Sequence, residues 1–280
     1  MRTIMLEFNR IHSLQFWWGQ FAGELGLFAM LLWPWVDREY TLDAFEELTG
    51  SRHTISYATP GGVKYDFTPK FLTKMETALS HVKERMPLFE DMLAGSPTFR
   101  LRTEGVGHYT AKQALKWGLS GPNIKACGIP MDLRKDDPDP NLAYNMIDWE
   151  VPTTHNEEHP GECDAFDRLL QRFKEIETSL DIIAKLLPLV PEGPIIDPKA
   201  RAKVNRLPEG EGYGRVEGTR GITTVWLKTM DKAQTPWRAK IRGPCFASYY
   251  SLKHIVPGAR FADFPAIFGS LDPYPGWWDR

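Results

Sequence analysis

The longest apolar stretch of the chain runs from Leu14 to Val36, and Glu24 is the one charged residue within it. Its 23 residues are enough to cross a bilayer, for which about 20 suffice. A membrane span is disfavoured because Glu24 would lie near the bilayer centre at a cost of several kcal/mol, and Pro34 interrupts the run. A secretory signal is disfavoured because the run is too long and no small-residue cleavage site follows it. We therefore predict a fully buried helix in a helical core.

Two small residues, Gly19 and Gly23, lie about one helical turn apart in this stretch. Their spacing leaves a flat strip on one face of the helix, so that another backbone can come close. Glu24 follows directly, among apolar neighbours that should raise the pKa of its carboxyl group through desolvation. Two interpretations of Glu24 stay open: a buried ion pair with an arginine of the core, or a carboxyl group that handles protons.

Capping signals and a 3.6-residue apolar period predict further helices. Thr68 followed by Pro69 marks a helix start, and Thr110 with Gln113 forms a capping box before a short helix. Glycines that favour helix ends close two of these segments. The predicted helices are Glu39 to Thr49 (before Gly50), Thr68 to about Met92, the short helix before Gly118, Glu162 to Leu187, Phe246 to Leu252 and Phe261 to Phe268.

The remaining segments are polar, rich in proline or strand-like. Pro130 to Gly161 reads as an ordered loop or surface excursion, and Pro188 to Pro208 as a linker. Two strand-like runs, Thr223 to Leu227 and Trp237 to Ile241, are joined by a polar turn. The sequence therefore predicts a mainly α fold with a small β-hairpin, in a single domain that covers residues 1–280.

The composition excludes some classes of function. The 34 Lys and Arg residues nearly balance the 36 Asp and Glu residues, so no strongly basic surface argues for nucleic acid. The three cysteines are isolated from one another, which fits a reducing compartment and gives no local zinc or iron–sulphur motif. Neither a dinucleotide fingerprint nor a P-loop is present. The ten tryptophans fit either an interface or an aromatic core.

A series of short motifs follows the order found in one known family. The segments are Leu6–Ile11, Gly19–Gly26, Asp43–Glu46, Thr49–Arg52, Gly61–Val63, Arg102–Gly107, Gly118–Pro122, Asp132–Lys135, Glu217–Gly221, Lys240–Phe246 and Gly269–Arg280. In this order they resemble the 49-kilodalton-type (D-type) subunit of respiratory complex I, the NADH-quinone oxidoreductase. This family shares a superfamily with the large subunits of [NiFe]-hydrogenases. The resemblance implies their helical core.

The C-terminal segment separates the branches of that superfamily. Hydrogenases place Cys-x-x-Cys directly after the Asp-Pro pair, because nickel prefers soft thiolate ligands. Here Tyr274 and Pro275 follow Asp272-Pro273, so the chain resembles the branch that binds no metal and handles a quinone. A hydrogenase-type subunit is therefore the less favoured interpretation. A non-catalytic structural or assembly paralogue stays open as an alternative.

The resemblance implies a peripheral subunit of an ion-translocating quinone oxidoreductase on the cytoplasmic face of the cell membrane. Glu24 and Asp272 are then the catalytic carboxyl groups that supply protons. The quinone-binding residues that the resemblance implies are Trp18, Glu24, Arg52, Arg242, Phe246 and Asp272. The two arginines can equally be structural ion-pair partners. Quinone would be the substrate, and no metal or iron–sulphur cluster would be bound by this chain.

The expected partners are an iron–sulphur subunit with the terminal 4Fe-4S cluster, a neighbour supplying an N-terminal sheet region, and membrane-arm subunits. The sheet region that the family has upstream lacks a counterpart, which suggests a split gene product, a fragment or a paralogue. Leu14 and Thr59 stand where the family usually has histidine and arginine. The electron donor stays open between NADH, ferredoxin and deazaflavin.

Overall fold

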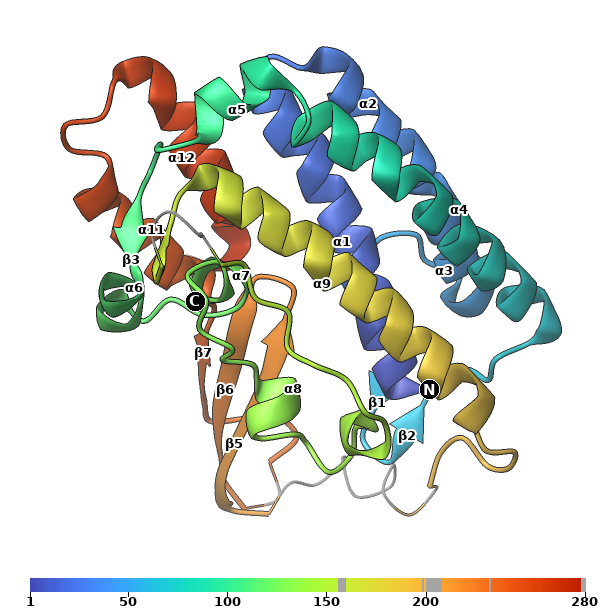
Figure 1. Cartoon of the computed structure of the whole chain (residues 1–280). Helices are drawn as coiled ribbons and strands as arrows, with labels where there is room; N and C mark the ends of the chain where they lie inside the picture. The colour runs from blue at the N-terminus through green and yellow to red at the C-terminus, as the bar shows by residue number, and fades with distance from the viewer. Residues whose placement is uncertain (156–159, 198, 200–207, 232, 278–280) are drawn as a thin grey trace.

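A computed structural model describes residues 1–155, 160–197, 199, 208–231 and 233–277. Its core is a bundle of long helices, α1 (Arg2–Glu24), α2 (Phe28–Asp37), α4 (Pro69–Leu93) and α9 (Ala165–Leu186), with α3 (Glu39–Thr49) beside α4. Figure 1 shows α1 inside this bundle, between α9 and α2. The prediction of a mainly helical fold is confirmed.

The apolar stretch near the N-terminus forms two helices, so the prediction of one fully buried helix is wrong. The chain turns after Glu24, where Gly26 adopts a φ of 90°, a conformation that glycine adopts without strain. Helix α2 then returns along α1 and leaves Phe28 and Val36 exposed. Among the described residues, we find no helix with both the length and the hydrophobicity needed to cross a lipid bilayer.

The two helices pack closely along the glycine strip of α1. A Cβ atom at Gly19 would lie 2.6 Å from the Trp35 indole nitrogen and 2.7 Å from the Leu31 carbonyl oxygen. At Gly23 it would lie 3.1 Å from a methyl group of Leu31. The prediction that these glycines permit close packing is confirmed.

The predicted caps are present. The Thr68 hydroxyl accepts from the amide of Phe71 at 3.1 Å at the start of α4, and Pro69 is the first helical residue. Thr110 and Gln113 form the predicted capping box of α6 (Ala111–Trp117), which Gly118 closes in the left-handed conformation. The long amphipathic helix α9 begins at Ala165, three residues after the predicted start, and Asp164 caps it.

Helix α12 (Phe264–Leu271) packs against α1 and α9, and shorter elements connect the long helices. They are α5 (Pro97–Thr103), α7 (Pro122–Lys125), α8 (Leu133–Asp136), α11 (Cys245–Ile255) and the 3₁₀ turns η1 (Tyr144–Met146), η2 (Leu187–Leu189), η3 (Phe261–Asp263) and η4 (Pro275–Trp277). Two small ladders, β1 (Ala58–Thr59) with β2 (Gly62–Val63) and β3 (Tyr109–Thr110) with β4 (Glu162–Cys163), tie loops to the bundle. A second hydrophobic core lies under α6, α11 and α12.

The sheet has three antiparallel strands in the order β5 (Gly210–Gly218), β6 (Gly221–Thr229) and β7 (Arg238–Arg242). The predicted hairpin is formed by β6 and β7, and β5 was missed. Strand β5 contains four glycines and mostly polar side chains, so it lacks the alternating apolar positions that are typical of a strand. Its pairing with β6 is nevertheless continuous from Gly210 to Gly218.

The predicted loop from Pro130 to Gly161 enters the interior at its beginning. Asp132 caps α8, and both Asp132 and Arg134 are buried. A surface excursion is therefore a wrong description of this first part, because its polar side chains find ion-pair partners inside the protein. The predicted linker from Pro188 to Pro208 lies partly outside the described residues.

Candidate functional site

Asp272 occupies an unusual backbone conformation at the end of α12. It caps that helix in the left-handed region, with φ 51° and ψ 54°, and among the described non-glycine residues it alone has a positive φ. Such a conformation costs free energy unless the surroundings enforce it, and aspartate tolerates it better than most residues. The side chain is thereby held inside the protein, where Asp272 is 8% exposed.

Arg220 is the ion-pair partner of this carboxylate. It lies in the turn between β5 and β6, and its Nε is 3.0 Å from the Asp272 Oδ1, outside good hydrogen-bonding geometry. Its Nη1 donates to the Ser13 hydroxyl on α1 at 3.1 Å. The guanidinium also lies over the Tyr274 ring, 5.4 Å from the centroid. Arg220 thus joins the sheet, α1 and the chain after α12 around one acid.

A second arginine, Arg172, lies on α9 and is almost fully buried. Its guanidinium lies 4.1 Å from the centre of the Trp17 ring and donates to the Asn123 side-chain oxygen at 3.3 Å. Burial lowers the pKa of Arg172 to about 10, although the charge of Asp272 acts in the opposite direction. Asn123 also donates to the Leu271 carbonyl oxygen at 3.0 Å, which fixes the residue before Asp272.

Glu24 reaches the same region from the last turn of α1. Its Oε1 accepts from the Gln20 amide at 3.0 Å, whereas its Oε2 is buried and finds no hydrogen-bond partner in the part of the chain that the structure describes. This second oxygen lies against Gly269 of α12, where any Cβ atom would overlap it. The amide of Asp272 in turn donates to the carbonyl oxygen of Gly269 at 3.1 Å. One residue of α12 therefore contacts both acids.

The surroundings raise the pKa of both carboxyl groups. Burial raises the pKa of Glu24, the hydrogen bond from Gln20 opposes this, and the charge of Asp272 raises it further. Burial also raises the pKa of Asp272, against the opposing charges of Arg220 and Arg172. Two coupled acids beside two cations can pass a proton and stabilise a nearby anion.

The other predicted site residues lie apart from this pair. Trp18 is buried in the main core, where its ring contacts those of Phe89 and Phe173. Arg52 pairs with three carboxylates of α3, and Figure 1 shows α3 well separated from α12. Arg52 thus forms ion pairs within its own part of the fold, and the described ring contacts of Trp18 are with core aromatics.

Arg242 and Phe246 flank the start of α11. Arg242 donates to the Gly118 carbonyl oxygen at 3.2 Å and is largely exposed. Phe246 is 60% exposed and lines an apolar groove of about 550 Å³ with other side chains of α11 and α12. Neither residue makes a hydrogen bond, ion pair or ring contact with Glu24 or Asp272 in the described part of the chain. The described residues also contain no group of three or more His, Cys, Asp or Glu side chains placed to hold a metal ion.

Sequence reasoning missed Arg220, Arg172 and Trp17. Arg220 stands within the Glu217–Gly221 motif. A charged residue between glycines is typical of an exposed turn, so no sequence pattern indicates that Arg220 pairs with Asp272. Arg172 had a clearer signal, because it falls on the apolar stripe of α9 among residues that pack in the core. A charged residue on a buried stripe requires a partner, and here the partners come from other elements.

Comparisons with known proteins give the relationships of the chain. Residues 24–206 and 199–280 match the family model described as the 49 Kd subunit of respiratory-chain NADH dehydrogenase. The D-type subunit of the NADH-quinone oxidoreductase of Syntrophobacter fumaroxidans is 36% identical over 97% of this chain and 70% of its own length. The D-type subunit from Clostridium beijerinckii is 34% identical over 100% of this chain and 73% of its own length.

A solved structure is similar over the whole chain. It is the structure of the membrane-bound sulfane sulfur reductase, an archaeal respiratory membrane complex. One chain of that complex superposes with a TM-score of 0.90 at 35% sequence identity, covering 100% of this chain and 74% of that chain.

Proposed function

Because the chain belongs to the family of the 49 kDa subunit of respiratory-chain NADH dehydrogenase, we propose that it is a peripheral subunit of a membrane-bound respiratory oxidoreductase. In that complex it forms one wall of the cavity that receives a quinone. Glu24 and Asp272 supply protons to the reduced head group. The electrons come from a 4Fe-4S cluster of a partner subunit, and the donor that feeds this cluster is left open.

The contact of Glu24 and Asp272 with the same residue, Gly269, carries this proposal. Reducing a quinone to a quinol consumes two electrons and two protons, and negative charge develops on its oxygens. Burial raises the pKa of both carboxyl groups toward the range in which a general acid works, which supports this role for them. The guanidinium groups of Arg220 and Arg172 stabilise negative charge in the same region.

The two arginines also keep the site assembled between turnovers. Arg220 holds Asp272 from the sheet side, and Arg172 lies on the bundle side against Trp17. A carboxylate that has just lost its proton is therefore not left uncompensated in a dry environment. This explains how Asp272 could alternate between its two protonation states without large rearrangement.

A second candidate function follows from the similar archaeal complex. The full-length superposition with a chain of a sulfane sulfur reductase makes a sulfur compound a competing acceptor. Reduction of such a compound also creates anionic products that the two arginines could stabilise. A protein that keeps the fold without taking part in catalysis is the third possibility, and the same experiment separates all three.

The test uses the assembled complex with Glu24→Gln and Asp272→Asn in this chain. We expect quinone-dependent turnover to fall about 100-fold in each, which is within the usual range for the loss of a general acid. Glu76→Gln, at an exposed position of α4, is the matched control and should behave as wild type.

Assembly is checked on native gels for every variant. Unchanged quinone turnover in both assembled variants would support the non-catalytic alternative. Turnover with a polysulfide but not with quinone, lost in the same two variants, would support the sulfur-reducing function.

A further inference from the structure

Glu217 is the one buried residue of strand β5, whose other residues are exposed or, at Gly218, half-buried. A glutamate on an exposed strand is readily tolerated. Glu217 is only 5% exposed, so its charge must be compensated by a partner or its carboxyl group must be neutral. Its surroundings therefore decide which of the two states it adopts.

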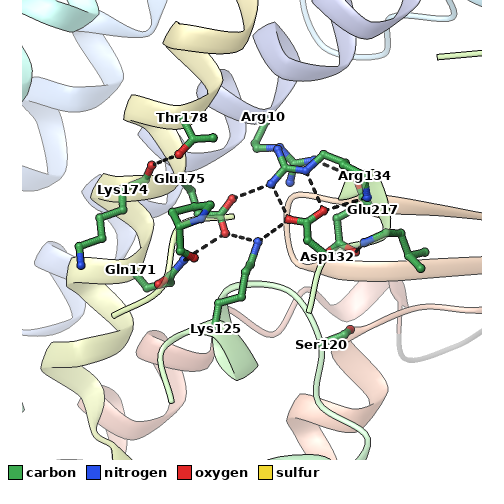
Figure 2. A network of polar contacts seen from close by, with 12 residues as sticks. Arg10, Ser120, Lys125, Asp132, Arg134, Gln171, Lys174, Glu175, Thr178 and Glu217 are labelled. Carbon is green, nitrogen blue, oxygen red and sulfur yellow. Dashed lines mark hydrogen bonds and ion pairs between the residues drawn. The ribbon is translucent and has the colours of Figure 1, made fainter. Parts of the chain in front are cut away.

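Glu217 borders a buried charge network that joins four elements. Figure 2 shows the network between α1, α7, α8 and α9, with Lys125, Asp132 and Arg134 at its centre. The Lys125 ammonium lies 2.8 Å from Asp132, and Arg134 lies 2.6 Å from the same carboxylate. The other members are Glu7, Arg10 and Glu175.

Without Glu217, this network is balanced. Its carboxylates are Glu7, Asp132 and Glu175, and its cations are Arg10, Lys125 and Arg134.

The acids of the balanced network stay ionised. Burial would raise the pKa of Glu7, but Arg10, Arg134 and hydrogen bonds lower it to about 2. Lys125 and Arg134 likewise outweigh burial and keep the pKa values of Asp132 and Glu175 low.

Among the described residues, Glu217 is a fourth carboxyl group without a cation of its own. Its Oε2 accepts from the Leu133 amide at 3.3 Å, and its Oε1 is buried without a hydrogen-bond partner. Arg10 donates to the backbone oxygen of Glu217 at 2.9 Å and pairs with the carboxylate of Glu7 instead. An ionised Glu217 would therefore add an unbalanced negative charge next to Asp132.

The electrostatics agree with this geometry. Burial and then the charge of Asp132 raise the pKa of Glu217 to about 7, although Lys125, Arg10 and Arg134 act against them. Further polar and charged groups near Glu217 are Arg215 of the same strand, paired with Asp137, and, from other elements, Glu7 of α1, Glu175 of α9, Tyr144 of η1 and Asp139.

Two cavities meet at Glu217. One holds about 10 Å³, the space of a single water molecule, and is also lined by Arg134 and Tyr144. The other holds about 220 Å³ between α1 and the turn from β5 to β6. Its lining includes Arg10, Ser13 and Arg220, and Arg220 is the ion-pair partner of Asp272. Water in the larger cavity would thus connect Glu217 with the neighbourhood of Asp272.

We propose that Glu217 is a proton-storing site, which takes up one proton from the solvent through water in the larger cavity and releases it through the same water toward the Asp272 carboxylate beside Arg220. The step changes only protonation: a carboxylate gains a proton and the network becomes neutral, then the proton leaves and the charge returns. The use of this proton for an acceptor rests on the function proposed above. The existence of the proton site at Glu217 does not depend on that function.

The first test is an infrared pH titration of the purified full chain between pH 5 and pH 9. We expect a protonated-carboxyl absorption that disappears with a midpoint near pH 7 and is missing in Glu217→Gln. Glu211→Gln, on the exposed part of the same strand, is the matched control and should keep the band. A titration that is the same in wild type and Glu217→Gln would overturn the proposal.

A second test concerns the assembled complex. Glu217→Gln should lower acceptor reduction about tenfold, the effect of losing part of a proton supply, and should flatten its pH profile around neutrality. Glu217→Asp should restore part of the rate, because it restores a titratable group. An equal loss in both variants, with no change of the pH profile, would show a purely structural role.

The two proposals fail in different ways. If Glu217 titrates as expected while Glu24→Gln and Asp272→Asn leave turnover intact, the proton site stands and the function proposed for the acids falls. If those two variants are inactive and Glu217 does not titrate, the function proposed for the acids stands and the proton site at Glu217 falls.

Discussion

Arg220 lies 3.0 Å from Asp272, between a turn of the sheet and the end of α12, and this ion pair links the sheet to the helical part of the site. Both side chains are mostly shielded from water. Their pairing explains how an acid in a left-handed backbone conformation keeps a defined position.

Removing the cation of this pair should destabilise the fold. Arg220→Met leaves a buried carboxylate without its partner, and we expect the free energy of unfolding to fall by about 3 kcal/mol. Asp272→Asn in the same chain should recover much of this loss. Denaturant unfolding of the two single variants and the double variant measures the coupling. If the loss of unfolding free energy in the double variant equals the sum of the losses in the two single variants, Arg220 and Asp272 are not energetically coupled.

The stability of the chain should depend on Glu217 between about pH 4.5 and pH 7. The unfolded chain releases this proton near its ordinary pKa of 4.5, whereas the folded chain keeps it until about pH 7. Stability from this group is therefore full at low pH and is lost as the pH rises through that window. The loss is of the order of 3 kcal/mol, since one pKa unit corresponds to about 1.4 kcal/mol.

Glu217→Gln removes this dependence. We expect the variant to match wild type near pH 4 and to become progressively more stable than wild type up to pH 8, as measured by urea unfolding. Glu211→Gln should follow the wild-type curve. A difference that does not change with pH would show that Glu217 is ionised in the folded chain throughout.

The glycine strip of α1 should tolerate substitution unequally. At Gly19 a Cβ atom meets a backbone oxygen and an indole nitrogen, so Gly19→Ala should cost about 2 kcal/mol through overpacking. At Gly23 it meets only a flexible leucine side chain at 3.1 Å or more. The helix propensity gained by alanine is the same in both, so Gly23→Ala should be clearly milder. Thermal unfolding of the two variants measures their losses of stability. Equal losses for Gly19→Ala and Gly23→Ala would argue against close packing of α1 with α2 at Gly19.

The three cysteines should be unreactive in the native chain. Cys127 and Cys163 lie with their sulphur atoms 2.9 Å apart, and all three thiols are buried. Burial would raise the pKa of Cys163, but the Cys127 thiol and Arg168 lower it, so access rather than ionisation limits its reaction. We expect no labelling by a maleimide in buffer and full labelling in denaturant. Rapid labelling of native Cys163 would contradict the packing of β3 and β4.

Local signals in the sequence determined much of the helical framework. The starts at Thr68 and Thr110 and the end at Gly50 are set by hydrogen bonds and backbone conformations within a few residues. The order of short motifs determined the family, which the comparisons confirm. It also selected Glu24 and Asp272, which the fold brings to the same residue of α12.

Tertiary structure alone decided burial and the choice of charged partners. Arg52, selected from a motif, pairs with acids of its neighbouring helix, whereas Arg220 and Arg172 reach Asp272 from distant elements. Glu217 lies in a strand that sequence patterns missed, and its pKa is raised by burial and by the charge of Asp132 at the start of α8. Desolvation and Coulomb interactions depend on which segments meet in space, and that information is not contained in the spacing of residues along one segment.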